Sequence, residues 1–147
     1  MENNTFLLLG NQLFDPKILK DQGCKRVFMA EDYGLCTYEK HHKLKIYLYL
    51  CAMREYKDEL QRNGIQVDYF SLEARTDKQT YIEFFINFLN KEKIDRINIF
   101  EIENKFFEKK VLTSLEGAGV EYDLSATPMF LFSRKEFDSL YGKNKTF

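Results

Sequence analysis

The chain is poor in the residues that interrupt or cross-link small proteins. Among its 147 residues it has no tryptophan, two prolines, seven glycines and three cysteines. The cysteines, Cys24, Cys36 and Cys51, are odd in number and show no CxxC spacing, which favours free thiols over a disulfide framework. The same spacing argues against a zinc or iron–sulfur site built from these three residues alone.

The chain also has no long apolar run and almost no net charge. No apolar run approaches the ~20 residues of a membrane span, and the first five residues lack the basic start of a signal peptide. The formal net charge of −1 gives no broad attraction to DNA or to an anionic membrane. We therefore expect a cytoplasmic protein without a membrane partner.

The chain does have enough apolar residues for one core of ordinary size. Hydrophobic residues make up 44% of it and aromatic residues 16%, which excludes a disordered chain. No internal repeat, low-complexity segment or proline- and glycine-rich linker divides it. The composition therefore predicts a single domain over residues 1–147.

Short apolar runs alternate with helical patterns along the chain. Strands are predicted at residues 5–9, 26–30, 65–72, 97–102 and 120–124. Apolar stripes at helical spacing follow at residues 42–63, at 78–91 and after Asn104, and Ser133 can begin a further short helix. Asn63 and Gly64 are typical of a left-handed helix end. This alternation predicts an α/β fold with a five-stranded parallel sheet and helices on both faces.

The carboxyl ends of the predicted strands carry the best candidates for a ligand crevice. Ligands of open parallel sheets bind outside these ends, near the point where strand order reverses. Gly10 permits a close backbone approach, while Asn11 and Gln12 each offer a donor and an acceptor, which suits a neutral, planar, hydrogen-bonding ligand. Glu31 follows the second strand. The alternative is that Asn11 and Gln12 only close a turn.

The start of the long helix is basic and holds both histidines. His41 and His42 are adjacent, so on a helix they point about 100° apart and do not grip one metal ion. One is expected to face the crevice and the other to face solvent or cap the turn, unless both are ordinary surface residues. Lys40, Lys43 and Lys45 oppose the helix dipole, which indicates an anionic or hydroxyl-rich partner nearby or simply solvated lysines.

Other motifs of catalysis and binding are absent. The chain has no GxGxxG and no GxxxxGK[ST] segment, and no recognisable nucleophile triad.

The helical segment at residues 81–89 is apolar nearly all round. Its excess residues, Phe84 and Phe88, either cover something beyond this domain or lie deep within it.

Several of these segments together resemble the cryptochrome/photolyase-related proteins, in particular the N-terminal domain of the bacterial deoxyribodipyrimidine-photolyase-related branch. The similarity covers almost the whole chain, and the double histidine with lysines after a GxQL segment is its most specific signal. It rests on Leu9-Gly10-Asn11-Gln12-Leu13, Glu31, Tyr38, His41-His42-Lys43-Leu44-Lys45-Ile46, Ala52-Met53-Arg54, Glu59-Leu60, residues 97–101, Gly119-Val120, Phe130-Leu131, Ser133 and Glu136-Phe137.

The resemblance implies a Rossmann-like three-layer α/β domain that binds a ribityllumazine-type light-harvesting antenna. It also implies a partner, a helical domain C-terminal to this one, which binds FAD, an iron–sulfur cluster and DNA and repairs pyrimidine lesions in light. The flavin pocket and cluster cysteines have no counterpart here, so this chain alone is expected to be inactive as a lyase. The antenna site would map onto Gly10, Asn11, Gln12, Glu31, Leu35, Tyr38, His41, His42 and Lys45, with residues 35–38 as a loop.

The chain departs from the family's pattern within this expected site. The family commonly has Asp in place of Asn11 and Glu in place of Leu35, and each replacement removes a hydrogen-bond acceptor, worth ~1–3 kcal/mol where a buried donor loses its partner. Tyr49 is also bulky for a pocket wall. Two other functions stay open: a non-catalytic docking module that uses Phe84 and Phe88, and a stand-alone nucleotide-binding protein of Rossmann-like fold.

Overall fold

The structure is a computed structural model that describes residues 4–37, 39–74 and 79–141. Its centre is one parallel sheet of five strands in the order β3-β2-β1-β4-β5. The strands are β1 (Thr5–Leu7), β2 (Arg26–Ala30), β3 (Gln66–Phe70), β4 (Arg96–Phe100) and β5 (Glu121–Ser125). This confirms the predicted fold, a Rossmann-like arrangement whose strand order reverses between β1 and β4.

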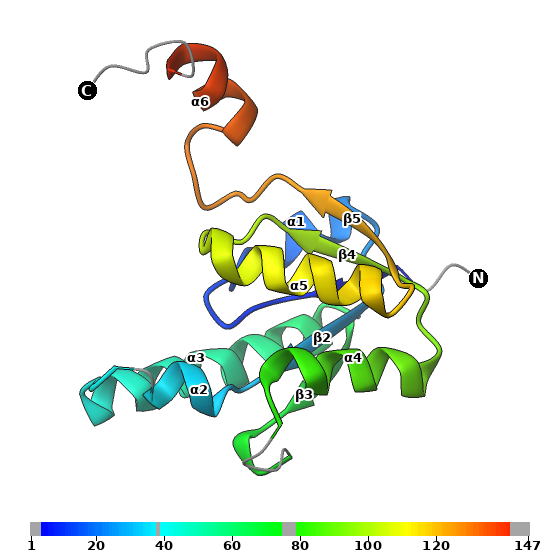
Figure 1. Ribbon diagram of the computed structural model, residues 1–147. Coiled ribbons are helices and arrows are strands. Elements are labelled where there is room, and N and C mark those ends of the chain that lie inside the picture. Colours follow the sequence, from blue (N-terminus) through cyan, green and yellow to red (C-terminus); the bar gives the residue numbers. More distant parts are fainter. Residues whose placement is uncertain (1–3, 38, 75–78, 142–147) are drawn as a thin grey trace.

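Helices cover both faces of the sheet (Figure 1). One face carries α1 (Pro16–Asp21) and α3 (Lys43–Arg62), and the other carries α4 (Tyr81–Glu92) and α5 (Lys105–Gly117). Two short helices, α2 (Tyr33–Thr37) and the 3-10 helix η1 (Leu72–Ala74), follow β2 and β3. The last helix, α6 (Arg134–Tyr141), stands apart from the three layers (Figure 1).

The alternation of apolar side chains along the central strands builds two cores, one on each face. Leu7 and Phe28 point toward α4 and α5, whereas Phe6, Leu8 and Met29 point toward α1 and α3. All five are at most 1% exposed. Because β1 and β2 are buried on both faces, they appear in the sequence as continuous apolar runs.

Phe28 lies at the centre of an aromatic cluster that explains the apolar excess of α4. Its ring centroid is 4.8 Å from that of Phe88 and 6.2 Å from that of Phe84, and Phe70 lies 5.0 Å from Phe84. Phe88 is buried and Phe84 is half-buried. Both residues therefore pack against the core of this domain, so the apolar excess of α4 does not by itself require a partner.

Side-chain caps set the ends of the helices. Asn104 and Thr80 cap the starts of α5 and α4, and Thr80 forms a reciprocal capping box with Glu83. Gly64 follows α3 at φ +79°, which confirms the left-handed end predicted there. The predicted start of α4, at residue 78, lies outside the described residues.

The structure corrects several boundaries. Four of the predicted strands differ from the observed ones by one or two residues at an end, and β1 stops at Leu7 rather than Leu9. Helices α1 and α2 were not predicted, because five or six residues are too few to show a helical period. The expected loop at residues 35–38 is helical as far as Thr37, where the carbonyl of Asp32 accepts a bond from the Cys36 N–H.

Within the described residues, no helix combines the length and apolarity that a membrane crossing requires.

Candidate functional site

The crevice predicted from the sequence lies where the strand order reverses, between the carboxyl ends of β1 and β4. Gln12 is fully buried there and bridges the two ends. Its Oε1 accepts a bond from the Leu9 N–H at 3.2 Å, and its Nε2 donates to the Glu101 carbonyl at 3.3 Å. The Gln12 amide is therefore engaged in holding two strand ends together.

Asn11 also contacts the end of β4. Its Nδ2 donates to Oε1 of Glu103. An aspartate at this position would place two carboxylates against each other. The amide of Asn11 therefore suits the Glu103 carboxylate in this chain.

The floor of the crevice at Gly10 is filled by two side chains from α3. A Cβ atom added to Gly10 would lie 2.6 Å from the Tyr49 hydroxyl and 2.6 Å from Sδ of Met53. The space left among Gly10, Cys36 and Tyr49 is about 20 Å3, close to the size of a single water. In this arrangement the crevice does not fit a ribityllumazine ring system.

Tyr49 is a neutral phenol in this position. Burial raises its pKa to about 12, and the charge of Glu103 adds to that effect. The hydroxyl beside Gly10 therefore keeps its proton. The sequence analysis noted that Tyr49 is bulky for a pocket wall. In the structure its side chain fills the space beside Gly10.

Glu31 is turned toward α3 and β3 and is 0% exposed. Its carboxylate accepts bonds from Arg54 Nε at 2.7 Å, the Tyr69 hydroxyl at 2.6 Å and the Leu72 N–H at 3.0 Å. Burial alone would raise the pKa of Glu31, but these three donors together outweigh it and hold the pKa below its usual value. The four groups form one cluster around the buried Glu31 carboxylate, and this cluster ties α3 to the edge of the sheet.

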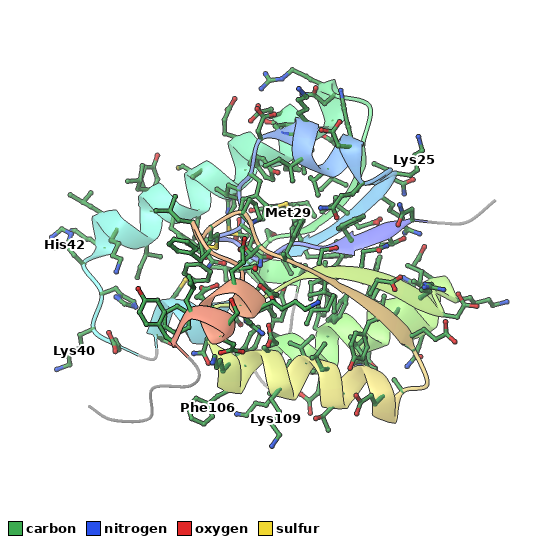
Figure 2. The ribbon with its side chains drawn as sticks, turned by 90° about the horizontal axis from the view of Figure 1, so that it is seen from above. Lys25, Met29, Lys40, His42, Phe106 and Lys109 are labelled. Atoms are coloured by element: carbon green, nitrogen blue, oxygen red, sulfur yellow. The ribbon has the colours of Figure 1, made fainter. Side chains whose placement is uncertain are left out.

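The two histidines take different positions at the start of α3. His42 caps the helix, since its Nδ1 accepts a bond from the Leu44 N–H at 3.2 Å, whereas His41 is half-buried before it. His42, like Lys45, is exposed. Figure 2 shows His42 and Lys40 at the far end of α3, away from the centre of the sheet.

The remaining predicted site residues are described in part. Leu35 belongs to α2, but its side chain is outside the described part of the structure, and Tyr38 lies outside the described residues altogether. The structure thus brings Gly10, Asn11 and Gln12 together at the crevice. Glu31 belongs to a separate cluster, and the basic start of α3 lies apart from both.

A second, part-buried ion pair ties Arg134, the first residue of α6, to Glu108 of α5 and to Ile102 just after β4. Both carboxylate oxygens of Glu108 accept bonds from Arg134, at 2.7 and 2.8 Å, and Oε2 also accepts the Ile102 N–H at 2.7 Å. Arg134 donates to the Ile102 carbonyl at 2.9 Å as well. Burial opposes the charge of Glu108, but these donors still keep its pKa below the usual value.

Sequence reasoning assigned no role to Arg54, Tyr69, Glu103 or the Glu108–Arg134 pair. An acid directly after a buried apolar run, as Glu31 follows Val27 to Ala30, indicates a buried carboxylate that needs a cation. Nothing in the pattern identifies Arg54, 23 residues beyond Glu31, as that cation.

The described residues contain no group of three or more His, Cys, Asp or Glu side chains arranged to hold a metal ion. The three cysteines are free thiols, and burial raises the pKa of Cys24 to about 12.

Comparison with protein families identifies a match over most of the chain. The family model described as deoxyribodipyrimidine photo-lyase-related protein matches residues 6–147. No curated protein matches the chain.

Proposed function

This chain belongs to the deoxyribodipyrimidine photo-lyase-related protein family, and from that premise we propose that it serves as the antenna-type α/β domain of a photolyase-like, light-dependent flavoprotein for DNA repair. The match over residues 6–147 carries the proposal. The parallel sheet with its reversal point between β1 and β4 supports it, because such sheets bind ligands at that edge.

The closed crevice sets a condition on antenna binding. A ring system has room beside Gly10 only when the Tyr49 side chain turns away, since the present space is about 20 Å3. Tyr49 is therefore proposed as the residue that limits the affinity for a ribityllumazine.

We further propose that an FAD-binding helical domain, joined to this one in a longer protein or carried on a separate chain, covers the carboxyl edge of the sheet. Two apolar surfaces are exposed at this edge. The first is the start of α3, where Leu44, Tyr47 and Leu48 are 64–70% exposed. The second is α6, where Phe137 and Tyr141 pack against each other, with centroids 5.1 Å apart, but stay more than half exposed. Exposed apolar patches of this kind mark interaction surfaces.

The test of the antenna role is binding of ribityllumazine, followed by absorbance between the near-ultraviolet and the blue after gel filtration. Tyr49→Ala removes the ring that closes the crevice and is expected to retain more chromophore than the unaltered chain. Tyr47→Ala is the matched control, because it deletes the same side chain from an exposed position on the same helix. If Tyr49→Ala retains no chromophore, the antenna role is refuted.

A further inference from the structure

A hollow lies between α4 and α5, apart from the crevice. It measures about 890 Å3, within the range of small-molecule sites. Tyr81 and Phe107 line both spaces, so their rings separate the hollow from the closed crevice beside Gly10. Asp32 also borders both. The hollow therefore opens at the same edge of the sheet but on the α4 and α5 face.

Two exposed aromatic rings border this hollow. Tyr33 at the start of α2 is 64% exposed, and Phe106 in the first turn of α5 is 85% exposed. Such large aromatic side chains are more often buried. The two residues lie more than seventy positions apart in the sequence. Aromatic rings held open to solvent at the rim of an apolar hollow are suited to cover the face of a flat ring.

The apolar wall between these rings is formed in part by Ile82, Phe107 and Leu72. Hydroxyl groups of Thr113 and Ser114 lie on the α5 side, and each is both a donor and an acceptor. A mostly apolar wall with a few hydroxyls is typical of sites for heteroaromatic rings.

The rim of the hollow carries two lysines and a glutamate, and the glutamate already accepts hydrogen bonds within the chain. Lys109 and Lys110 both line the hollow and are exposed. The Glu83 carboxylate also lines it, but its Oε2 accepts bonds from the N–H and the hydroxyl of Thr80 at 2.8 and 2.9 Å. Figure 2 shows Lys109 projecting from the same side of α5 as Phe106. The α5 rim thus offers an aromatic face beside two cations.

We infer that the hollow between α4 and α5 binds a flat heteroaromatic compound with a phosphate or carboxylate tail, its ring lying against Phe106 and Tyr33 and its tail near Lys109 and Lys110. This site is separate from the crevice that Tyr49 closes. It goes beyond the proposed antenna function, because it holds whether or not a ribityllumazine binds at Gly10.

The test uses riboflavin and FMN, which share a flat ring system and differ by one phosphate. Each is titrated into the chain and followed by quenching of flavin fluorescence. FMN is expected to bind more tightly than riboflavin. The double variant Lys109→Ala with Lys110→Ala is expected to raise the Kd of FMN about tenfold, which corresponds to about 1.4 kcal/mol shared by two exposed charge contacts, and to leave that of riboflavin unchanged.

Further variants locate the ring. Phe106→Ala is expected to raise the Kd of both flavins at least threefold, a loss of the size that aromatic pairs produce, and it removes an exposed side chain that the fold does not need. The double variant Lys17→Ala with Lys25→Ala, two exposed lysines away from the hollow, is the control and should change nothing.

Three results would overturn the inference. The first is no saturable quenching below about 1 mM FMN. The second is FMN binding that neither the Lys109 and Lys110 double variant nor Phe106→Ala weakens. The third is FMN binding that depends on Tyr49→Ala, which would move the ligand to the crevice. Because the antenna proposal is tested by ribityllumazine and Tyr49, either can fail without the other.

Discussion

Replacing Glu31 by alanine tests whether the buried acid is a structural anchor. The substitution leaves three donors without their acceptor: Arg54, the Tyr69 hydroxyl and the Leu72 N–H. Arg54 is 53% exposed, so water recovers much of its bond and its loss costs about 1 kcal/mol. The other two donors are part-buried and cost about 1 kcal/mol each. We expect Glu31→Ala to lower the free energy of unfolding by about 3 kcal/mol.

Urea unfolding followed by circular dichroism measures this difference. Glu55→Ala is the matched control, because Glu55 also pairs with an arginine, Arg62 at 3.2 Å, but both side chains are at least 67% exposed. That control is expected to change stability by less than about 0.5 kcal/mol. If Glu31→Ala unfolds at the same urea concentration as the control, the carboxylate is not an anchor and the reasoning fails.

The same carboxylate predicts a dependence on pH. The pKa of Glu31 in the folded chain lies below its ordinary value of 4.5. Its contribution to stability is therefore fully present above pH 4.5 and is lost as the pH falls through the lower, folded pKa. The stability difference between Glu31→Gln and the unaltered chain should be constant from pH 7 to about pH 5 and shrink on further acidification. A difference that grows in acid would contradict the assignment.

Three other substitutions test the fold around the site. Gly10→Ala forces its new methyl group against the Tyr49 hydroxyl and should cost about 1–3 kcal/mol, measured by thermal unfolding; an unchanged melting temperature would show that Tyr49 moves freely. Arg134→Ala leaves Glu108 without its cation and should speed hydrogen exchange in α6 while β1 and β2 stay protected; uniform exchange across the chain would argue against a local anchor. Thr80→Ala removes the capping box and should cost about 1 kcal/mol by urea unfolding, and no change would show that the cap is dispensable.

The layered fold could be predicted from the sequence because each strand has its own signal. The buried strands β1 and β2 appear as apolar runs, and Asn63-Gly64 and Asn104 identify helix ends through local chemistry. The reversal between β1 and β4 depends on pairing across about ninety residues, and no local pattern specifies it.

The residues of the site could be identified more easily than their contacts. Gly10, Asn11 and Gln12 were placed correctly at a strand end, but whether an amide faces a ligand or a neighbouring carbonyl depends on the position of β4. The burial of Phe84 depends in the same way on Phe70, a residue of another strand. Such contacts follow from packing between distant segments, which single-chain patterns do not encode.

The position of β1 in the middle of the sheet affects how this protein emerges from the ribosome. β1 pairs on one side with β2 and on the other with β4, where Leu7 lies opposite Ile99. At 5–20 residues per second, translation of the intervening segment takes roughly 5–20 s. Throughout that interval the second hydrogen-bonding edge of β1 has no strand to pair with. Nascent chains of this topology therefore expose an unpaired strand that carries Phe6 and Leu7, and they are expected to depend on chaperones until β4 has been synthesised.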